Sequence, residues 1–383
     1  MQVIRFIYAS DVLLGERRVN LVEVSLVAVS FRHIVAVVCS SNPITTSIGV
    51  LLESSSSKPH LESCSVDRTL QTLSDPWSFL VLRELWFGLK RFDEFQGTLR
   101  IPRATLSNRL KALREAGLLM QVPSPQGGLR KEYRFTEKGA DLYPVMLTLL
   151  RWGDRWKNGD AGIPLHLTHH ACGKRLVTEV VYSCCGTKVN AKDVEYQDGP
   201  GAGVEPAAAG SKTNRSSKPD KFTLPRACSV ARTLQVMGDR WSFLVIREMF
   251  FGRHRFDEIQ KRVGIATNIL SNRIKLLMSH DILERSNYGA GSTRYEYHLT
   301  ASGMDLYASF LAMMRWGDHW LSEEQGAPLI LRHKKCGKVF EPEVVCKQCR
   351  LPLVAHEVHY KPGPGWDVNF GEDILAHTML PRK

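Results

Sequence analysis

The chain is poor in the features that mark secreted, membrane-spanning or catalytic proteins. Nine cysteines in 383 residues are too few for a secreted disulfide scaffold, so we expect a reducing cytoplasm. The most apolar stretch, 21–39, is interrupted by Glu23, Arg32 and His33, and it lacks the roughly 18 clean residues of a membrane span. The sequence has no phosphate loop, nucleophile elbow or HExxH motif. These absences argue against an enzyme and against a membrane partner.

Acidic residues are also scarce relative to basic ones. The chain has 51 Lys and Arg against 39 Asp and Glu, a formal net charge of +12. This balance favours a polyanionic partner. A composition of 43% hydrophobic and 23% charged residues is typical of a globular protein, and the length suffices for two or three domains.

The first 60 residues have no counterpart elsewhere in the chain. Arg17-Arg18 before an apolar stretch also occurs in twin-arginine export signals, but no convincing cleavage site with small residues follows. We therefore expect a poorly ordered N-terminal extension over 1–60, or a start codon assigned too early. The extension ends in SSSSKPH (54–60), which reads as a linker.

The chain contains one long internal sequence repeat. Residues 64–201 (copy one) recur as 228–365 (copy two) at a constant offset of 164. About 45% of the aligned positions are identical, and the period is too long for a solenoid repeat of roughly 20–50 residues. The segment is therefore a duplicated domain. Between the copies, 201–221 is rich in Gly, Ala, Ser and Pro, which predicts a flexible connector.

Each copy begins with a pattern of short helices. In copy one, residues 66–73 have apolar residues at helical spacing. Pro76 is suited to the first turn of a second helix, which ends at Gly88, and FDEFQGTL (92–99) is predicted to form a third, short helix. A further helix follows over 102–117, with its leucines facing inward. Its outer face carries cations and small polar groups, which suit phosphate and base edges. This pair predicts a helix-turn-helix.

The next residues predict a wing. LLMQVP (118–123) and RKEYRFT (130–136) alternate apolar residues as strands, and Gly127-Gly128 form a flexible tip. From Lys90 to Arg134, ten basic residues face four acidic ones, whereas the equivalent part of copy two has seven against five. The side chains that we predict to contact DNA in the two copies are Arg103, Thr105, Ser107, Asn108, Arg109, Lys111, Arg130, Lys131, Thr267, Asn268, Ser271, Asn272, Arg273, Lys275 and Arg294.

A long apolar helix is predicted over 137–156. It carries more apolar surface than a small winged domain can cover, so we favour a helix-helix interface that makes a dimer contact, with burial in the core as the alternative.

These motifs resemble the HxlR-type winged helix-turn-helix transcriptional regulators of bacteria. The resemblance rests on Cys-Ser-Val, DxWSFLVIRE, RFDEIQ, GIATNILSNRIKLL, Y-x-LT-x-SG and RWGDHW in copy two, and on their counterparts in copy one. Copy one departs from it with IPRATLSNR. The resemblance implies DNA-binding homodimers that place a recognition helix from each subunit in the major groove. It also implies that Cys64 and Cys228 are candidate thiol sensors, although each could equally be a small buried residue.

A small cysteine-rich module follows the long helix of each copy. His333, Cys336, Cys346 and Cys349 have the spacing H-x2-C-x9-C-x2-C, which predicts one structural zinc site within copy two. A redox dithiol or an empty hairpin are the alternatives. Copy one has Tyr182 where copy two has Cys346, so we expect a degenerate ribbon without metal there.

We therefore predict a mainly α protein with small β elements: tandem winged helix-turn-helix domains, each followed by a ribbon-like β module. The function would be sequence-specific regulation of transcription in the cytoplasm, with double-stranded DNA as partner. The two domains would pair within one chain, and a further dimer is left open. The alternatives are a thiol- or metal-dependent redox protein, or a protein-protein interaction module that has lost DNA binding. The predicted boundaries are 1–60, 61–158, 159–201 (degenerate ribbon), 202–224 (linker), 225–322, 323–366 (zinc ribbon) and 367–383 (tail).

Overall fold

The computed structural model describes most of both copies. The described residues are 3–6, 12–14, 17–19, 24–27, 60–73, 75–125, 130–158, 162–206, 228–237, 239–287 and 294–364. The predicted wing tip Gly127-Gly128, most of the linker (207–224) and the tail lie outside them. The chain divides into two units, Met1–Ser56 and Ser57–Lys383.

The first unit contains two short antiparallel strand pairs. Strand β1 (Val3–Phe6) pairs with β4 (Val24–Val27), and β2 (Val12–Leu14) pairs with β3 (Arg17–Val19). The second unit, which contains both copies, begins with β5 (His60–Glu62). Strand β5 pairs with β11 (Val204–Pro206), so the predicted connector starts with a short strand.

Copy one folds as the helical pattern predicts. Helix α1 (Ser65–Leu73) is followed by α2 (Pro76–Trp86), α3 (Phe92–Leu99) and α4 (Arg103–Glu115). Asp75 caps α2 by accepting a hydrogen bond from the Ser78 backbone amide, and Pro76 occupies the first turn, where its missing N–H costs nothing. The inward leucines of α4, Leu106, Leu110 and Leu113, are buried.

The wing is a hairpin, and the long helix after it is broken. Strand β6 (Leu119–Pro123) pairs with β7 (Lys131–Phe135). The single helix predicted over 137–156 is wrong: α5 (Glu137–Ala140) ends before α6 (Tyr143–Trp156) begins. Copy two has the same break, between Ala301–Asp305 and Tyr307–Leu321, with Ala308 where copy one has Pro144, so the break does not depend on the proline.

Copy two repeats this order. Its helices are α7 (Ser229–Met237), α8 (Arg240–Phe250), α9 (Phe256–Val263), α10 (Thr267–Ser279), α11 (Ala301–Asp305) and α12 (Tyr307–Leu321), and its wing is β12 (Leu283–Asn287) with β13 (Tyr295–Leu299). The ribbon strands are β8 (Leu165–His169), β9 (Thr178–Tyr182) and β10 (Val194–Asp198) in copy one, and β14 (Leu329–His333), β15 (Pro342–Cys346) and β16 (Val358–Pro362) in copy two.

Every ribbon strand pairs with a strand of the other copy. Strand β9 pairs with β15, β8 with β16, and β10 with β14, all antiparallel. The ribbon was expected to form a hairpin inside each copy, and each ribbon does bond within its own copy: the Leu176 amide donates to the Leu167 carbonyl, and the Phe340 amide donates to the Leu331 carbonyl. The longer hydrogen-bonded ladders join the two copies.

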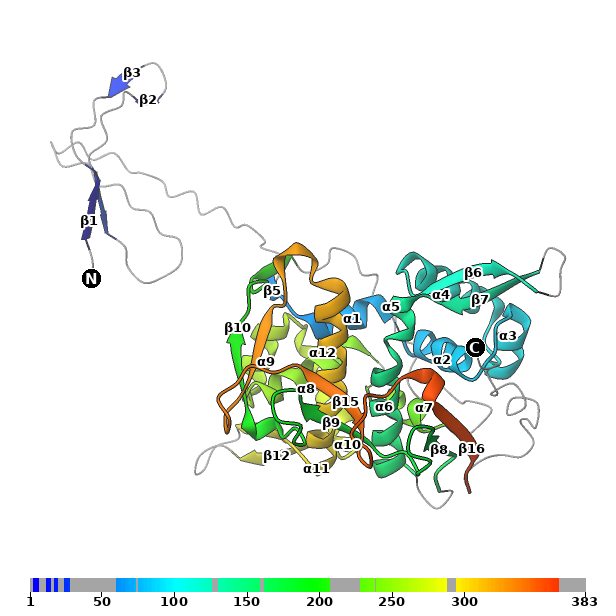
Figure 1. The fold of residues 1–383 in the computed structure, drawn as a ribbon. Helices are drawn as coiled ribbons and strands as arrows, with labels where there is room; N and C mark the ends of the chain where they lie inside the picture. Colours follow the sequence, from blue (N-terminus) through cyan, green and yellow to red (C-terminus); the bar gives the residue numbers. More distant parts are fainter. Residues whose placement is uncertain are drawn as a thin grey trace. The chain divides into compact units, whose positions relative to one another are not determined.

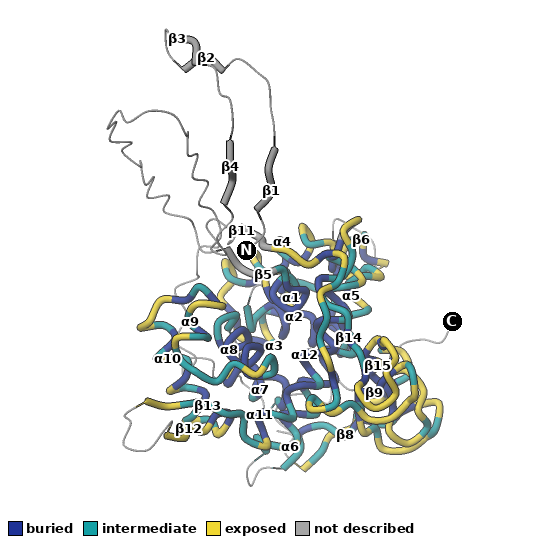
Figure 2. The backbone as a smooth tube through the Cα atoms, turned by 90° about the vertical axis from the view of Figure 1, so that its left-hand side faces the viewer, coloured by how far each residue is buried: buried dark blue, intermediate teal, exposed yellow. Residues whose placement is uncertain are grey.

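The helices also pack across the two copies. Helix α1 contacts α12, α6 contacts α7, and α6 and α12 lie side by side between the two winged regions (Figure 1). Buried segments gather where α1, α2, α8 and α12 approach one another (Figure 2). Trp152 and Trp316, at equivalent positions of α6 and α12, are almost fully buried. The contact predicted for the apolar helix is therefore made with the other copy of the same chain.

Polar contacts between the copies occur in equivalent pairs. The Thr69 hydroxyl donates to the Met313 carbonyl at 3.0 Å, and the Thr233 hydroxyl donates to the Leu149 carbonyl at 2.8 Å. Gly153 lies against the Ser229 carbonyl, where a Cβ atom would come within 2.1 Å of the oxygen. The offset of 164 relates the two members of each pair, so the copies contact each other through nearly the same surface.

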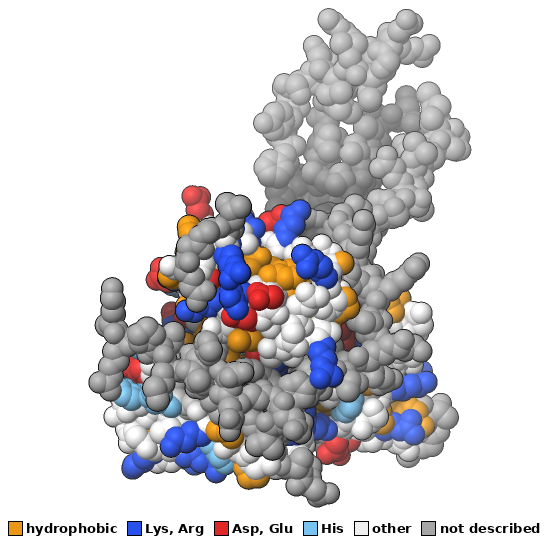
Figure 3. Space-filling view, turned by 90° about the vertical axis from the view of Figure 1, so that its right-hand side faces the viewer, with side chains coloured by type: hydrophobic (Ala, Val, Ile, Leu, Met, Phe, Trp, Pro, Cys, Tyr) orange, Lys and Arg blue, Asp and Glu red, His pale blue; other side chains and the backbone are white. Residues whose placement is uncertain are grey.

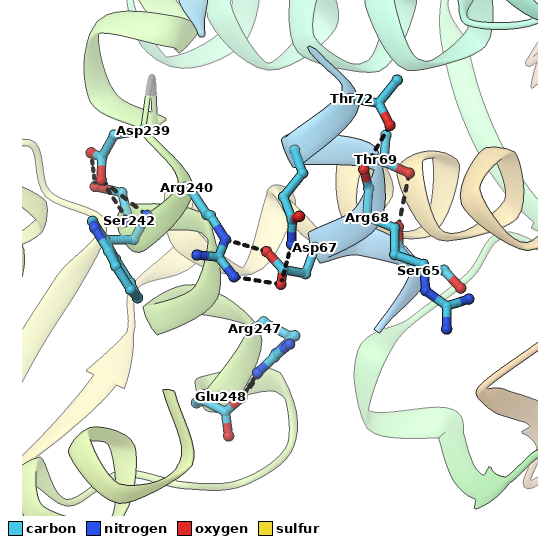
Figure 4. A network of polar contacts seen from close by, with 12 residues as sticks. Ser65, Asp67, Arg68, Thr69, Thr72, Asp239, Arg240, Ser242, Arg247 and Glu248 are labelled. Atoms are coloured by element: carbon cyan, nitrogen blue, oxygen red, sulfur yellow. Dashed lines mark hydrogen bonds and ion pairs between the residues drawn. The ribbon is translucent and has the colours of Figure 1, made fainter. Parts of the chain in front are cut away.

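One contact breaks this equivalence. The Arg240 guanidinium binds the Asp67 carboxylate through two nitrogens, with Nη2 at 2.7 Å from Oδ2 (Figure 4). The corresponding positions on the other side are Pro76 and Ala231, which cannot form an ion pair. Sequence divergence between the copies has therefore made their interface asymmetric.

Candidate nucleic-acid interface

Helices α4 and α10 present similar polar faces. In α4, Arg103, Ser107, Asn108 and Lys111 are exposed, and Thr105 is half-buried. In α10, Thr267, Asn268, Asn272 and Lys275 are exposed, and Ser271 is half-buried. Neither helix has a side-chain cap at its N-terminus, because Pro102 and Ala266 occupy the cap positions. In α10 the Ile269 amide instead donates to the Asn268 side-chain oxygen at 2.9 Å. First-turn amides without a cap residue can face a phosphate.

Two of the predicted DNA contacts are arginines that form partly buried ion pairs within their own copy. Arg109 forms an ion pair with Asp75, and Nε of Arg273 lies 3.1 Å from Oδ1 of Asp239. The relative solvent exposure of the two arginine side chains is 19% for Arg109 and 15% for Arg273. Asp75 and Asp239 are also the N-caps of α2 and α8. The arginines thus connect each recognition helix to the helix behind it.

The environment of Asp75 follows from this arrangement. Burial raises the pKa of Asp75, whereas the Arg109 guanidinium and the backbone amide of Ser78 oppose the rise. An unpaired carboxylate here would be costly, because a buried charge needs a partner. This favours a structural role for Arg109 over a contact with DNA.

The base of each wing adds cations to the same domains. Arg130 and Lys131 are exposed at the start of β7, and Arg294 is exposed before β13. The face that includes the winged region of copy one carries several separate Lys and Arg side chains, with some Asp and Glu side chains among them (Figure 3).

The turn before each recognition helix differs between the copies. Arg100 ends α3 with a left-handed backbone, φ 49°, whereas Gly264 occupies the same position in copy two with φ 66°. Glycine adopts this conformation without steric cost, and arginine does not. The turn of copy one is therefore the more strained.

The predicted thiol positions also lie at the contact between copies. Cys64 is buried, and Cys228 is half-buried. The Sγ atom of Cys228 lies 2.6 Å from Nη1 of Arg83, which belongs to copy one. Cys64 has the equivalent hydrogen bond with Arg247 of copy two. Each thiol therefore contacts a buried guanidinium of the other copy.

The cysteine and histidine residues of the ribbons form two clusters that could each hold a metal ion. Cluster one contains His169, Cys172, Cys346 and Cys349, and cluster two contains Cys184, Cys185, His333 and Cys336. In each cluster the donor atoms lie within 4.8 Å of one another. The four residues predicted as one site in copy two are thus divided between two clusters, because the ladders across the copies bring each turn of copy two beside a turn of copy one.

Sequence reasoning missed the contribution of copy one. It treated Tyr182 as the loss of a ligand, but the adjacent pair Cys184-Cys185 lies beside His333 and Cys336. Tyr182 instead stacks on the His333 ring, with centroids 3.8 Å apart and an interplanar angle of 12°. Cys184, the additional cysteine beside Cys185, was the feature of the sequence that could have indicated the second cluster.

Comparison with known proteins agrees with the fold. The model of the HxlR-like helix-turn-helix family matches residues 72–161 and 236–325. An uncharacterized HTH-type transcriptional regulator of Mycobacterium tuberculosis strain H37Rv is 38% identical over 138 residues, which are 36% of this chain and 87% of the relative. An uncharacterized HTH-type transcriptional regulator of Synechocystis is 32% identical over 104 residues, 27% of this chain and 77% of the relative.

Among solved structures, a proposed transcription factor, PA1607, is 34% identical. The match covers 30% of this chain and 80% of that one, with a TM-score of 0.29. Within the described part of the chain, no helix has the length and apolar character needed to cross a membrane.

Proposed function

Because the chain belongs to the HxlR-like helix-turn-helix family of transcriptional regulators, we propose that it binds DNA sequence-specifically as an intramolecular pseudo-dimer. The family is one of regulators rather than of enzymes, and it implies DNA binding. In this proposal each copy supplies one recognition helix, α4 or α10, to one half-site. A regulator of this kind would act in the cytoplasm.

The observation that carries the proposal is the paired set of contacts between the copies. Helix α1 packs on α12 and α7 packs on α6, and equivalent threonines bond across both contacts. These contacts support a two-fold arrangement within one chain, like that which a homodimeric regulator obtains from two chains. Paired recognition helices of this type enter successive major grooves about 34 Å apart.

The operator should have two unlike half-sites. The first exposed turn of α4 carries Arg103 and Thr105, whereas that of α10 carries Thr267 and Asn268. Side chains in this part of a recognition helix contact base edges. Ser107-Asn108 and Ser271-Asn272 are the same in the two copies, so part of each half-site should be shared.

Footprinting on the DNA that flanks the protein's own gene, followed by measurement of stoichiometry, tests the proposal. We expect one chain to protect two neighbouring half-sites of imperfect symmetry, with an affinity that falls steeply with salt and discriminates between sequences. Two chains on a perfect palindrome would overturn the intramolecular version. Salt-dependent binding without sequence discrimination would overturn sequence-specific recognition.

The alternative of a thiol redox protein has less support. Cys346 and Cys349 face His169 and Cys172, and so form part of a four-donor cluster rather than an isolated dithiol. The alternative of an interaction module without DNA binding has to account for the exposed cations and amides of α4 and α10.

We also propose Cys64 and Cys228 as thiol sensors. Each thiol contacts a buried arginine of the other copy, so modification of the sulfur would disturb the interface between the copies. Cys228 is the more accessible of the two. An alkylating reagent should therefore modify Cys228 before Cys64 and reduce DNA affinity, whereas unchanged affinity after complete modification would exclude the sensor.

A further inference from the structure

We propose that the chain binds two Zn²⁺ ions, each held by ligands from both copies. Cluster one takes a histidine and a cysteine from copy one and two cysteines from copy two. Cluster two takes two cysteines from copy one and a histidine and a cysteine from copy two. The inference is independent of DNA binding, because it concerns only the ribbon strands and the turns that follow them.

The donor atoms are nearly as far apart as the ligands of a tetrahedral ion. Zinc lies about 2.3 Å from a thiolate sulfur and about 2.0 Å from an imidazole nitrogen, so tetrahedral ligand atoms are about 3.5–3.8 Å apart. In cluster one, Nδ1 of His169 lies 3.6 Å from Sγ of Cys172 and 3.2 Å from Sγ of Cys349. The corresponding distances from Nδ1 of His333 to Cys185 and Cys336 are 3.6 and 3.2 Å.

The set of donors points to zinc. Three cysteines and one histidine form a closed, four-ligand structural site without an open position for catalysis. The eight cysteines that the structure describes are all free thiols, and six of them lie in the two clusters. In cluster two, the sulfur atoms of Cys184 and Cys336 lie 3.4 Å apart, which suits two thiolates on one ion and is too long for a disulfide bond.

The position of His169 is a further argument for cluster one. Its side chain is fully buried, its Nδ1 faces the sulfurs, and its Nε2 has no hydrogen-bond partner. The Glu357 carboxylate lies 3.6 Å from that Nε2. A carboxylate beside the outer nitrogen of a ligating histidine orients the ring and raises its basicity. Glu357 also comes from copy two.

The residues around the ligating histidine of cluster two differ from those of cluster one. Asp193, the counterpart of Glu357, pairs with Lys335 at 2.8 Å, and the His333 ring is supported by Tyr182 instead. Cluster one has two buried and two half-buried members, whereas Cys185 and Cys336 of cluster two are exposed. The two sites should therefore differ in how firmly they hold the ion.

Both ions would join the copies beside the β9–β15 ladder. Cluster one links the turn after β8 to the turn after β15, and cluster two links the turn after β9 to the turn after β14. Each ion thereby crosslinks parts of the chain that are more than 140 residues apart in sequence. Zinc would stabilise the association of the two copies as well as the ribbons.

Zinc content, measured by mass spectrometry on the full chain purified with a reducing agent, tests the proposal. We expect two zinc ions per chain, and one after either Cys336→Ser or Cys346→Ser. The double variant C336S/C346S changes two ligands of the same copy and should lose both ions. The double variant C172S/C346S changes ligands of both copies and should keep one. Cys39→Ser, outside the described residues, is the matched control and should keep two.

The reverse pattern would overturn the proposal. If each copy bound its own ion, C336S/C346S would keep one ion and C172S/C346S would keep none. A wild-type chain with fewer than two ions would also contradict it. Exchange with Co²⁺ controls for misfolding. A folded single variant should retain the absorption of tetrahedral cobalt from its intact cluster. A single variant that shows no such absorption would contradict the proposal.

Discussion

Val180 of β9 lies opposite Val344 of β15, and these two residues are each other's counterparts in the duplication. An antiparallel ladder that pairs a residue with its own duplicate has a local two-fold axis between them. The ladder of β8 with β16 has the ladder of β14 with β10 as its counterpart: His169 lies opposite Val358, and His333 lies opposite Val194. The ribbons thus join the two copies in the way that two identical subunits join in a dimer.

Alanine at the glycines of the RWGD motifs should destabilise the contact between copies. A Cβ atom at Gly153 would lie 2.1 Å from the Ser229 carbonyl oxygen, and one at Gly317 would lie 2.5 Å from that of Ser65. We expect Gly153→Ala to lower the free energy of unfolding by about 1–3 kcal/mol, measured by urea denaturation. The matched control is Gly97→Ala on α3, where a Cβ atom meets nothing within 4 Å. It should be neutral or stabilising by up to about 1 kcal/mol, because alanine favours a helix over glycine.

Acidification should strengthen the same contact. Burial raises the pKa of Asp154 and that of Asp318 from 3.8 to about 6, with smaller opposing effects from Ser229 and Ser65. Between these values the folded state binds more protons than the unfolded state, so stability falls as pH rises through this window. We expect the free energy of unfolding to decrease from pH 4 to pH 6. The double variant D154N/D318N should flatten this dependence, and an unchanged slope would contradict the assignment.

Arg109 and Asn108 should have separable roles although they are neighbours. Arg109→Ala leaves the partly buried Asp75 without its ion partner, so we expect a loss of about 1–3 kcal/mol of stability. Arg273→Ala should do the same in copy two. Melting temperature, measured alongside DNA affinity, checks this. An Arg109→Ala protein that keeps its melting temperature but loses sequence discrimination would place Arg109 on the DNA instead.

Substitution of the exposed asparagines should affect one half-site each. Asn108→Ala should weaken recognition by about 1–3 kcal/mol at the half-site read by α4, and Asn272→Ala should do so at the other half-site. Binding to operators with one altered half-site would assign each effect. Lys111→Ala is the contrast, because loss of a phosphate contact should weaken all sequences alike and reduce the salt dependence. If both asparagine variants lost affinity for the same half-site, the copies would not divide the operator.

A chelator should remove the ion of cluster two before the ion of cluster one. Cluster two has exposed ligands, Cys185 and Cys336, so a chelator should take its ion first and that of cluster one later. The release of metal over time, followed with a colorimetric indicator, should show two phases, and Cys185→Ser should lack the fast one. Glu357→Gln should speed the slow phase, because loss of a carboxylate beside a ligating histidine weakens metal affinity about 10- to 100-fold. A single phase in the wild type would contradict the difference between the clusters.

Local chemistry explains how much of the fold could be predicted. Asp75-Pro76 favours the start of a helix because aspartate caps the N-terminus and proline fits the first turn. The spacing of the leucines in α4 predicts the buried face of this helix even though the residues that pack against it are not known from the sequence. The break between α5 and α6 was missed because the apolar pattern runs on through Pro144. The internal partner of Arg109 was missed because an arginine among polar residues resembles a DNA contact in sequence.

The duplication, the winged helix-turn-helix order and the residue types that can bind DNA and metal follow from the amino-acid sequence, because they depend on local patterns and spacing. The pairing of each ribbon strand and the cluster that each ligand joins follow from the tertiary structure. Two similar copies offer the same hydrogen-bonding edges within a copy and between copies, so sequence cannot distinguish the two pairings. Packing of α1 on α12 and of α6 on α7 brings the ribbons together across the chain, and this places His169 beside Cys349 and His333 beside Cys185.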